Sequence, residues 1–315
     1  MNVPQTNSVV QDSEVDVNSK TENKKNTSQY SVTHKTVFSY SEETRENVNQ
    51  VRLKITEDAY QKIDFYLLTV LPATKLTEYP DFYGNTVHYF EVNPPHKQLV
   101  IESRSVVSIK SKVDYDRLPY GSDHSELENL SNNEELYEFL NDSTYIKRVL
   151  PIWKEALDVK DNSNDVFQTC YALMSMVFEL CVYCTNSTNS ETTAEEFFKI
   201  KKGVCQDYAH LLIAYCRSLN IPARYISGYI WDPSEGNKEK VMIGSQASHA
   251  WVEVYIPTTG WIGLDPTNNK VVNEQYIKIG IGRDYDDVAP IRGTFYGGGK
   301  RRSMQVTVDV KRVAH

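Results

Sequence analysis

The sequence predicts an α+β protein: an N-terminal antiparallel β-sandwich, followed by a domain in which helices pack on an antiparallel sheet. From Tyr30 to about Val113, runs of β-branched and aromatic residues alternate in polarity and are separated by turn signals. Apolar helical segments then precede two further strand patterns. The length of 315 residues exceeds what one hydrophobic core usually organises, so two domains are expected.

Three segments follow from this pattern. Residues 1–28 are rich in Asn, Ser, Thr, Lys and Glu with few large apolar side chains, which predicts a disordered polar tail. Residues 29–115 form the predicted β-sandwich domain, and residues 116–315 form the second domain.

The β-rich segment contains clear strand and turn signals. Strand patterns cover Thr36–Tyr40, Asn49–Ile55 and Leu99–Glu102. The residues Asp81–Asn85 precede another strand pattern, and their Gly and Asn tolerate positive φ, so a hairpin is expected there. The histidines of this segment lie in strand or turn contexts and are interpreted as structural: His34, His88 and His96.

The second domain begins with helical signals. After an irregular connection at 114–130, one helix is expected over Asn133–Leu140 and a stronger one over Val166–Tyr183. The polar residues at 162–165 offer N-caps for the stronger helix. Its apolar residues run almost all round the helix, which predicts that it is buried on every side.

Charge and hydropathy exclude several classes of partner. The chain has 34 basic and 42 acidic residues, a net charge of −8 and a pI near 5.5, so nucleic acid is not the expected partner. No stretch approaches the ~20 apolar residues of a membrane span, and we expect no membrane partner. The N-terminus lacks a basic-then-apolar signal, so a cytoplasmic location is expected.

The five cysteines form a poor disulfide framework, because their number is odd and residues 1–169 contain none. Cys181 and Cys184 form a C-x-x-C motif at the end of the second helix. A redox site or half of a zinc site is one interpretation, but no second Cys or His pair stands at zinc spacing. We interpret both as ordinary helix or core thiols.

Cys205 differs from the other thiols because a helix is predicted to begin there. Gly203 permits a tight turn before it, and the helix should stop at Asn220, before Pro222. One predicted buried stripe comprises Ala209, Leu212, Ile213, Cys216 and Leu219. A helix N-terminus favours a thiolate, and its N–H groups can hold a carbonyl oxygen that becomes negative.

Two histidines are candidates for a base beside Cys205. His210 lies five residues further along the helix, roughly 140° away from Cys205, and therefore points elsewhere. His249 opens an alternating strand that ends at Ile256. The apolar residues of that strand form one face, so His249, Trp251 and Glu253 project to the other side.

Asp265 lies in the next strand pattern, and its face depends on the turn at 257–260. A four-residue loop would put Asp265 opposite His249, whereas a three- or five-residue loop would put both on one face. A catalytic pair therefore predicts an odd loop or a bulge near Gly260. The structural alternative is a buried thiol at 205, a half-exposed histidine at 249 and a turn-forming acid at 265.

These residues lie in blocks that resemble the transglutaminase-like superfamily, in its bacterial form with an N-terminal β domain. The blocks are Gly203–His210 with Ile221–Tyr225, then Ser248–Val254, then Gly260–Asn268. A tract at 282–293, beginning Gly-Arg-Asp-Tyr-Asp-Asp, is similar to one typical of this branch. The resemblance spans roughly residues 30–312. It implies a papain-like or transglutaminase-like core within 116–315, which makes that segment the catalytic domain.

The resemblance implies Cys205 as nucleophile, His249 as base and Asp265 as the acid that orients it. The implied chemistry is thiolate attack on an amide and a thioester acyl-enzyme. The second oxyanion donor stays open between the backbone N–H and the side chain of Gln206. No cofactor and no metal are expected. The acids of the later tract are interpreted as turn or rim residues: Asp284, Asp286 and Asp287.

The favoured function is cysteine-dependent hydrolysis of a peptide or amide, with a peptide or protein as substrate. One alternative is a protein-glutamine transamidase that cross-links or deamidates. Another is a non-catalytic binding module on the same fold, and a metal or redox protein using Cys181 and Cys184 comes last. The sequence leaves oligomeric state and physiological substrate open.

Overall fold

The structure is a computed structural model that describes residues 27–110, 118–130, 133–160, 162–234, 242–245 and 247–313. The predicted tail lies outside the described residues, except that Thr27 and Ser28 already belong to the first strand. Residues 114–117 of the predicted connection also lie outside them.

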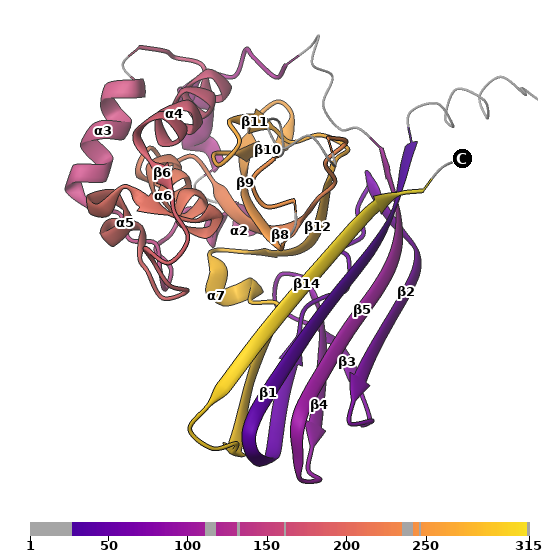
Figure 1. Ribbon diagram of the computed structural model, residues 1–315. Coiled ribbons are helices and arrows are strands. Elements are labelled where there is room, and N and C mark those ends of the chain that lie inside the picture. Colours follow the sequence, from indigo (N-terminus) through magenta and orange to yellow (C-terminus); the bar gives the residue numbers. More distant parts are fainter. Residues whose placement is uncertain are drawn as a thin grey trace, which may run out of the picture.

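The N-terminal part forms an antiparallel sheet in the order β2-β5-β1-β4-β3, and β13 and β14 also pair with β1 (Figure 1). The strands are β1 (Thr27–Val51), β2 (Gln61–Leu71), β3 (Thr77–Pro80), β4 (Thr86–Val92), β5 (His96–Lys110), β13 (Ile291–Gly297) and β14 (Arg302–Arg312). The predicted hairpin at 81–85 joins β3 to β4, with Gly84 at φ +79°.

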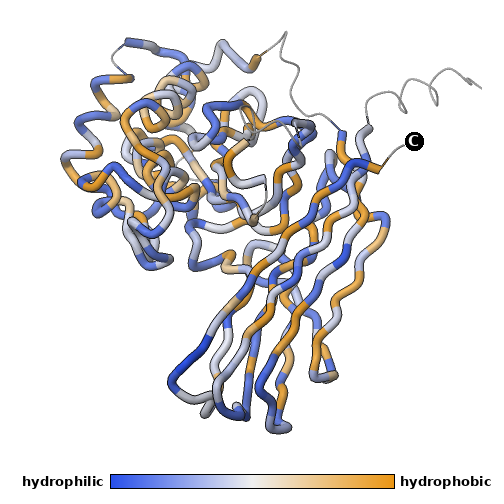
Figure 2. The backbone as a smooth tube through the Cα atoms, in the orientation of Figure 1, coloured by the Kyte–Doolittle hydropathy of each residue, from blue (hydrophilic) through white to orange (hydrophobic). Residues whose placement is uncertain are grey.

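Strand β1 belongs to both halves of this sheet. Up to Ser39 it pairs with β5 and, through Tyr30–Tyr40, with β14; its register with β5 shifts between Ser39 and Thr44. From Thr44 it pairs with β13, and from Asn47 also with β4. The strands therefore form one curled sheet, where the sequence predicted a sandwich of two sheets. Apolar and polar residues alternate along the strands (Figure 2). The apolar side chains form a core on the inner face of the curled sheet.

The end of the chain completes the N-terminal sheet. Tyr30 pairs with Arg312 and Tyr40 with Arg302, so β14 lies along β1 on the side away from β5. The predicted division at residue 115 assigns these C-terminal strands to the catalytic part, but they belong to the first sheet. Such pairing joins residues more than 260 positions apart, which local sequence patterns do not encode.

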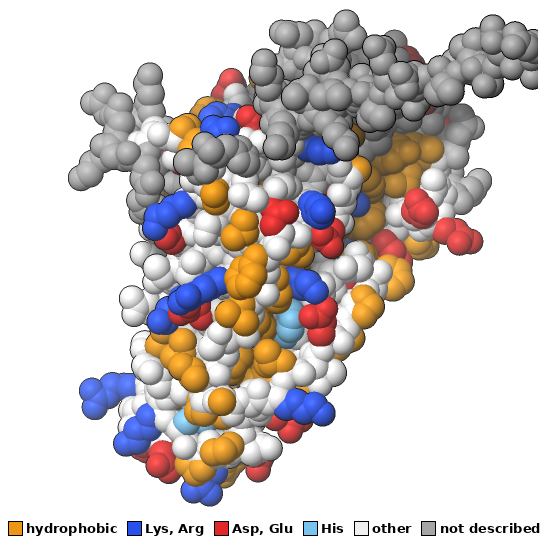
Figure 3. Space-filling model, turned by 90° about the vertical axis from the view of Figure 1, so that its right-hand side faces the viewer, with side chains coloured by type: hydrophobic (Ala, Val, Ile, Leu, Met, Phe, Trp, Pro, Cys, Tyr) orange, Lys and Arg blue, Asp and Glu red, His pale blue; other side chains and the backbone are white. Residues whose placement is uncertain are grey.

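Strand β2 lies at one edge of the curled sheet and exposes Phe65, Leu67 and Leu71. Figure 3 views this side and shows apolar side chains gathered between charged ones. Lys62 and Asp64 are exposed on the same strand. Charged residues on an edge strand discourage pairing with another chain.

The second part packs helices against an antiparallel sheet in the order β11-β10-β9-β8-β12 (Figure 1). The sheet comprises β8 (Ala223–Ile230), β9 (His249–Ile256), β10 (Gly260–Asp265), β11 (Lys270–Val271) and β12 (Tyr276–Gly282), and β6 (Val182–Tyr183) pairs separately with β7 (Lys202–Gly203). The helices are η1 (His124–Leu130, 3₁₀), α2 (Glu134–Tyr137), α3 (Leu150–Lys160), α4 (Val166–Leu180), α5 (Ala194–Ile200), α6 (Cys205–Ser218) and α7 (Tyr285–Val288). This arrangement confirms the α+β prediction.

Helix α4 is capped by Asp165, whose side chain accepts from the Gln168 backbone N–H at 2.7 Å, as its sequence predicted. The prediction that it is buried on all sides is wrong. Tyr171, Phe178 and Leu180 are exposed, because α4 packs with only part of its circumference against α3, α6 and the sheet.

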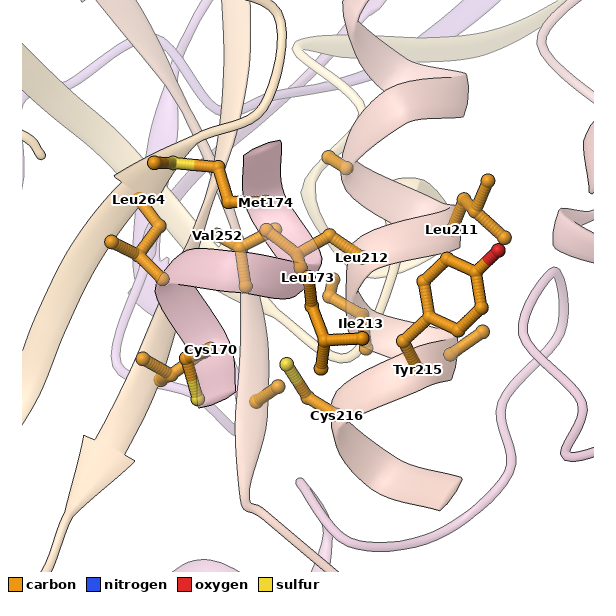
Figure 4. Close-up of a cluster of buried hydrophobic side chains, with 14 of the residues drawn as sticks. Cys170, Leu173, Met174, Leu211, Leu212, Ile213, Tyr215, Cys216, Val252 and Leu264 are labelled. Carbon is orange, nitrogen blue, oxygen red and sulfur yellow. The ribbon is translucent and has the colours of Figure 1, made fainter. Parts of the chain in front are cut away.

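Helix α6 is the central helix of the second part. It contacts α3, α4, α5, β8 and β9, and residues 207–217 are all buried, where the sequence predicted a single buried stripe. Cys170 on α4 and Cys216 on α6 lie in this core beside Leu173 and Ile213 (Figure 4). Both thiols therefore act as small apolar side chains, as predicted.

Candidate active site

Cys205 is the first residue of α6, and its neighbours explain why the helix begins there. The Asp207 carboxylate accepts a hydrogen bond from the Val204 backbone N–H at 2.7 Å and another from the Thr188 hydroxyl at 2.6 Å. A Cβ at Gly203 would overlap the same carboxylate, so glycine is required before the helix. The first turn thus places the partly exposed Cys205 beside backbone N–H groups that have no partner within the helix.

His249 begins β9 and is 2% exposed. The ring of Trp251 stacks on it, with centroids 6.3 Å apart and an interplanar angle of 24°. Gly228 of β8 pairs with His249. Because Gly228 has no Cβ, it leaves the space that the Trp251 ring occupies. As predicted, the apolar residues of the other face pack into the helical core: Ala250, Val252, Val254 and Ile256.

The turn between β9 and β10 has the odd length that a His249–Asp265 pair requires. Ile256 pairs with Gly260, so the loop comprises three residues, 257–259, and Gly260 has φ +83°. With this register, Asp265 lies on the same face as His249 and Trp251. The prediction of an odd loop is confirmed.

Nε2 of His249 and Oδ2 of Asp265 are 2.9 Å apart, and both side chains are fully buried. Within the described residues, Oδ2 also accepts from Asn268 Nδ2 at 2.7 Å and from the Tyr276 hydroxyl at 2.9 Å. Oδ1 accepts from the Thr267 backbone N–H at 2.9 Å. These donors stabilise an ionised carboxylate in the protein interior.

The interaction between His249 and Asp265 shifts the pKa of both side chains. Burial by itself lowers the pKa of His249, but the charge and hydrogen bond of Asp265, with a further contribution from Cys205, raise it from 6.5 to about 10. Burial raises the pKa of Asp265, but the His249 charge and the hydrogen bonds from His249, Asn268 and Tyr276 outweigh burial and lower it. The pair is thus an imidazolium and a carboxylate at neutral pH.

The second ring nitrogen of His249 is left for Cys205. Asp265 occupies Nε2, and the nearby thiol contributes to the raised pKa of the imidazole, so Nδ1 is the ring nitrogen left for the thiol. Nδ1 makes no hydrogen bond of ordinary geometry within the described residues. Nδ1 is therefore the ring nitrogen available to the Cys205 thiol.

Three residues that the sequence did not single out complete the site. Asn268 links the Asp265 carboxylate to the segment before β9: its Oδ1 accepts from the Ile243 N–H at 2.9 Å, and its Nδ2 donates to the Ile243 carbonyl at 3.1 Å. Gly244, at φ +93°, lies against Nδ1 of His249. Tyr276 reaches Asp265 from β12. Asn268 lies three residues after Asp265, so the sequence alone could have indicated that it is near this carboxylate. The sequence gives no such indication for Tyr276 and Gly244.

The other candidates lie apart from this pair. His210 accepts a hydrogen bond from the Tyr285 N–H at 3.2 Å, away from Cys205 as predicted. Cys181 caps the end of α4, and Cys184 is partly exposed; neither forms a disulfide. The Gln206 side chain donates to the Ser190 carbonyl at 3.0 Å.

The acids of the later tract make protein contacts. Asp284 caps α7 and accepts from the Tyr145 N–H at 2.9 Å, and Asp287 pairs with Arg283 at 3.0 Å. Among the described residues, no group of His, Cys, Asp and Glu has the arrangement of a metal site. No helix in the described ranges is long and apolar enough to cross a membrane.

Comparisons with known proteins agree with this architecture. Residues 30–108 match the bacterial transglutaminase-like N-terminal region, and residues 155–266 match the transglutaminase-like superfamily core. An uncharacterized protein of Mycobacterium leprae is 30% identical over 287 residues, which is 90% of this chain and 98% of the relative.

Two further matches differ in reach. A crystal structure of a proposed cysteine protease from Cytophaga hutchinsonii has a TM-score of 0.72 at 22% identity, over 92% of each chain. A protein-glutamine gamma-glutamyltransferase of Pseudomonas aeruginosa is 30% identical over 81 residues, which is 26% of this chain and 12% of that protein. The first likeness shows the fold. The chain therefore belongs to the transglutaminase-like superfamily, in the bacterial form that joins an N-terminal region to a transglutaminase core.

Proposed function

We propose that the protein is a cysteine-dependent hydrolase of amide bonds in a peptide or protein, acting through a thioester acyl-enzyme. One observation carries the proposal: a fully buried His249–Asp265 pair, 2.9 Å apart, lies beside a partly exposed thiol at a helix N-terminus, which contributes to the raised pKa of His249. A buried carboxylate that holds one imidazole nitrogen, with the other nitrogen turned to a nucleophile, is the arrangement of a catalytic triad.

In the first half-reaction, the Cys205 thiolate attacks the amide carbonyl carbon and a C–S bond forms. The imidazolium of His249 then gives its Nδ1 proton to the leaving nitrogen, and the C–N bond breaks. The products are a free amine or ammonia and a thioester on Cys205. Asp265 stays ionised throughout and keeps the ring in position.

In the second half-reaction, water attacks the thioester while neutral His249 accepts its proton at Nδ1. The C–S bond breaks, a carboxylic acid leaves, and the thiolate–imidazolium pair is restored. The N–H groups of the first turn of α6 are the available donors for the oxyanion in both steps. The side chain of Gln206 is bonded to Ser190, which favours its backbone N–H over its amide as a donor.

Transamidation is a second candidate, supported by the 81-residue match to the Pseudomonas aeruginosa glutamyltransferase. A primary amine in place of water would attack the same thioester, and a new amide would form. Incubation with glutamine-containing peptides and a primary amine probe separates the two outcomes, because mass spectrometry distinguishes amine incorporation from hydrolysis or deamidation.

The proposal is tested by replacing Cys205 with Ala. We expect Cys205→Ala to abolish amide turnover and the rapid alkylation of the protein by iodoacetamide near neutral pH, because the thiolate is the nucleophile in both reactions. Cys184→Ala is the matched control, since Cys184 is the other partly exposed thiol among the described residues. This control should retain turnover and the rapid labelling.

Equal labelling of the wild type and Cys205→Ala would refute Cys205 as the reactive thiol. A broad peptide-library screen with both proteins, read by mass spectrometry, would identify the cleaved, deamidated or cross-linked substrate. Absence of any change that depends on Cys205 would favour a binding module on the same fold.

A further inference from the structure

Strand β12 carries Tyr276 to the catalytic carboxylate and lies at the edge of the second sheet. Tyr276 begins the strand and pairs with Ile230 of β8. Its hydroxyl donates to Oδ2 of Asp265 at 2.9 Å, and its ring meets Trp251 edge-on with centroids 5.3 Å apart. Because Oδ2 is also the atom that accepts from His249, any displacement of the Tyr276 hydroxyl acts directly on the catalytic pair.

Side-chain amides of the N-terminal sheet hold the outer edge of β12. Gln61 accepts from the Lys278 N–H at 2.9 Å through Oε1 and donates to the Lys278 carbonyl at 2.7 Å through Nε2. Asn85 makes the same double contact with Ile281, with both distances 2.7 Å. Each amide thus occupies the position of a neighbouring backbone strand.

The Gln61 contact lies two residues from Tyr276, whereas the Asn85 contact lies five residues away. Lys278 adds ion pairs to Asp58 at 2.9 Å and to Glu253 at 3.1 Å, so its side chain joins the two parts of the molecule at the same point. Gln61 itself is 5% exposed. The contact nearest the candidate active site is therefore buried and consists of two hydrogen bonds between Gln61 and the Lys278 backbone.

A small cavity adjoins the contact between Gln61 and β12. A cavity of about 70 Å³ lies between the two parts, and both Gln61 and Tyr276 line it together with Trp251 and Lys278. A side chain next to open space is not held by contacts on every side. The position of Tyr276 consequently depends on directional hydrogen bonds as well as on packing.

We propose that the N-terminal sheet positions the catalytic carboxylate: Gln61 holds β12 so that Tyr276 donates its hydroxyl to Oδ2 of Asp265. Tyr276 and Gln61 are positioning residues, and neither touches the substrate amide. The inference rests on the proposed function in that it assigns them a role in the same triad.

Four variants test this inference. Tyr276→Phe removes only the hydroxyl that reaches Asp265. Gln61→Met removes the amide that hydrogen-bonds the Lys278 backbone and keeps a similar side-chain length. Tyr229→Phe is the control for a buried hydroxyl. Tyr229 lies on β8, next to β12, and its hydroxyl is hydrogen-bonded to His34 of the N-terminal sheet at 2.9 Å. Asn85→Leu is the control for an amide grip that lies further from Tyr276.

Two measurements avoid the need for a substrate. The first is the rate of Cys205 alkylation by iodoacetamide, which we expect to fall about tenfold in Tyr276→Phe, less than the ~10²-fold cost of a 1 Å misplacement. Gln61→Met should show a smaller loss. The double variant Tyr276→Phe/Gln61→Met should lose no more than Tyr276→Phe alone, because both changes act through one hydroxyl.

The second measurement is the low-field proton signal of the His249 Nε2–H bond on acidification. The Tyr276 hydroxyl helps to lower the pKa of Asp265, so without it Asp265 takes up a proton at higher pH. We expect the signal to disappear at higher pH in Tyr276→Phe and Gln61→Met than in wild type. Tyr229→Phe and Asn85→Leu should keep the wild-type pH, even where their melting temperatures fall.

The inference is overturned if Gln61→Met and Asn85→Leu lose stability alike while both keep the wild-type alkylation rate and proton signal. It is also overturned if the losses of Tyr276→Phe and Gln61→Met multiply in the double variant. Failure of the proposed hydrolysis would look different: wild-type thiol reactivity and proton signal would be intact, and no amide would turn over.

Discussion

His249 and His210 are both buried completely, but their surroundings make His249 a cation and leave His210 neutral. His249 is bonded to an ionised carboxylate, and its pKa rises to about 10. His210 lies between the rings of Tyr145 and Tyr225, and its pKa falls to about 3 because of burial and the nearby charge of Arg217. The comparison teaches that burial favours a neutral imidazole, and that the charge of a neighbouring side chain decides whether a buried imidazole is protonated.

Asp265→Asn should produce the largest effect, because it gives His249 surroundings more like those of His210. Without the carboxylate, burial lowers the pKa of the imidazole, and the amide no longer selects the tautomer with a proton on Nε2. We expect turnover to fall about 10³–10⁴-fold. Nuclear magnetic resonance titration of the imidazole should show its pKa below 6.5 instead of near 10.

Asp287→Asn is the control for this variant, because Asp287 pairs with Arg283 outside the triad. It should keep turnover near that of the wild type. An Asp265→Asn protein that retains both wild-type turnover and a raised imidazole pKa would show that the carboxylate does not set the state of His249.

Gly244→Ala should produce the next largest effect. A Cβ at this position would overlap Nδ1 of His249, the nitrogen left for Cys205, and the backbone has φ +93°. Displacement of the ring by about 1 Å should reduce turnover ~10²-fold. Turnover and iodoacetamide labelling of Cys205 both report this loss.

Gly121→Ala separates this steric effect from backbone strain. Gly121 has φ +104°, but a Cβ there meets no atom within 4 Å. Both variants should lose stability, since an L-residue is strained at either φ, while only Gly244→Ala should lose activity. Equal activity in the two variants would contradict the contact between Gly244 and the catalytic ring.

The sequence predicted the local features of the site well. Cys205 at a helix start and His249 at the head of an alternating strand follow from short-range periodicity, whereas the odd loop before Gly260 followed only from the requirement that His249 and Asp265 share one face. The α+β class follows from the same signals. The direction of His210 was also correct, because helical geometry alone determines it.

Long-range partners could not be predicted in this way. The pairing of β1 with β14 and the reach of Tyr276 on β12 to Asp265 on β10 depend on how distant segments of the chain are ordered within each sheet. The exposed apolar residues of α4 show a related limit. Hydrophobicity of Tyr171 or Phe178 indicates a tendency to be buried, but the number of neighbouring elements decides how much of a helix is covered.

His210→Gln should produce the smallest effect on activity and a specific effect on stability. In wild type, the folded pKa of about 3 lies below the ordinary 6.5, so acidification protonates the unfolded chain before the folded protein. His210 therefore costs the fold stability as pH falls from 6.5 toward 3, at up to ~1.4 kcal/mol per pH unit. Glutamine keeps an acceptor for the Tyr285 N–H and does not titrate.

Chemical denaturation should thus show the variant less stable than wild type at pH 7, with the gap between their free energies of unfolding narrowing toward pH 4. A gap that is independent of pH would mean that His210 takes up its proton at the same pH in the folded and unfolded protein, and the contrast with His249 would fail.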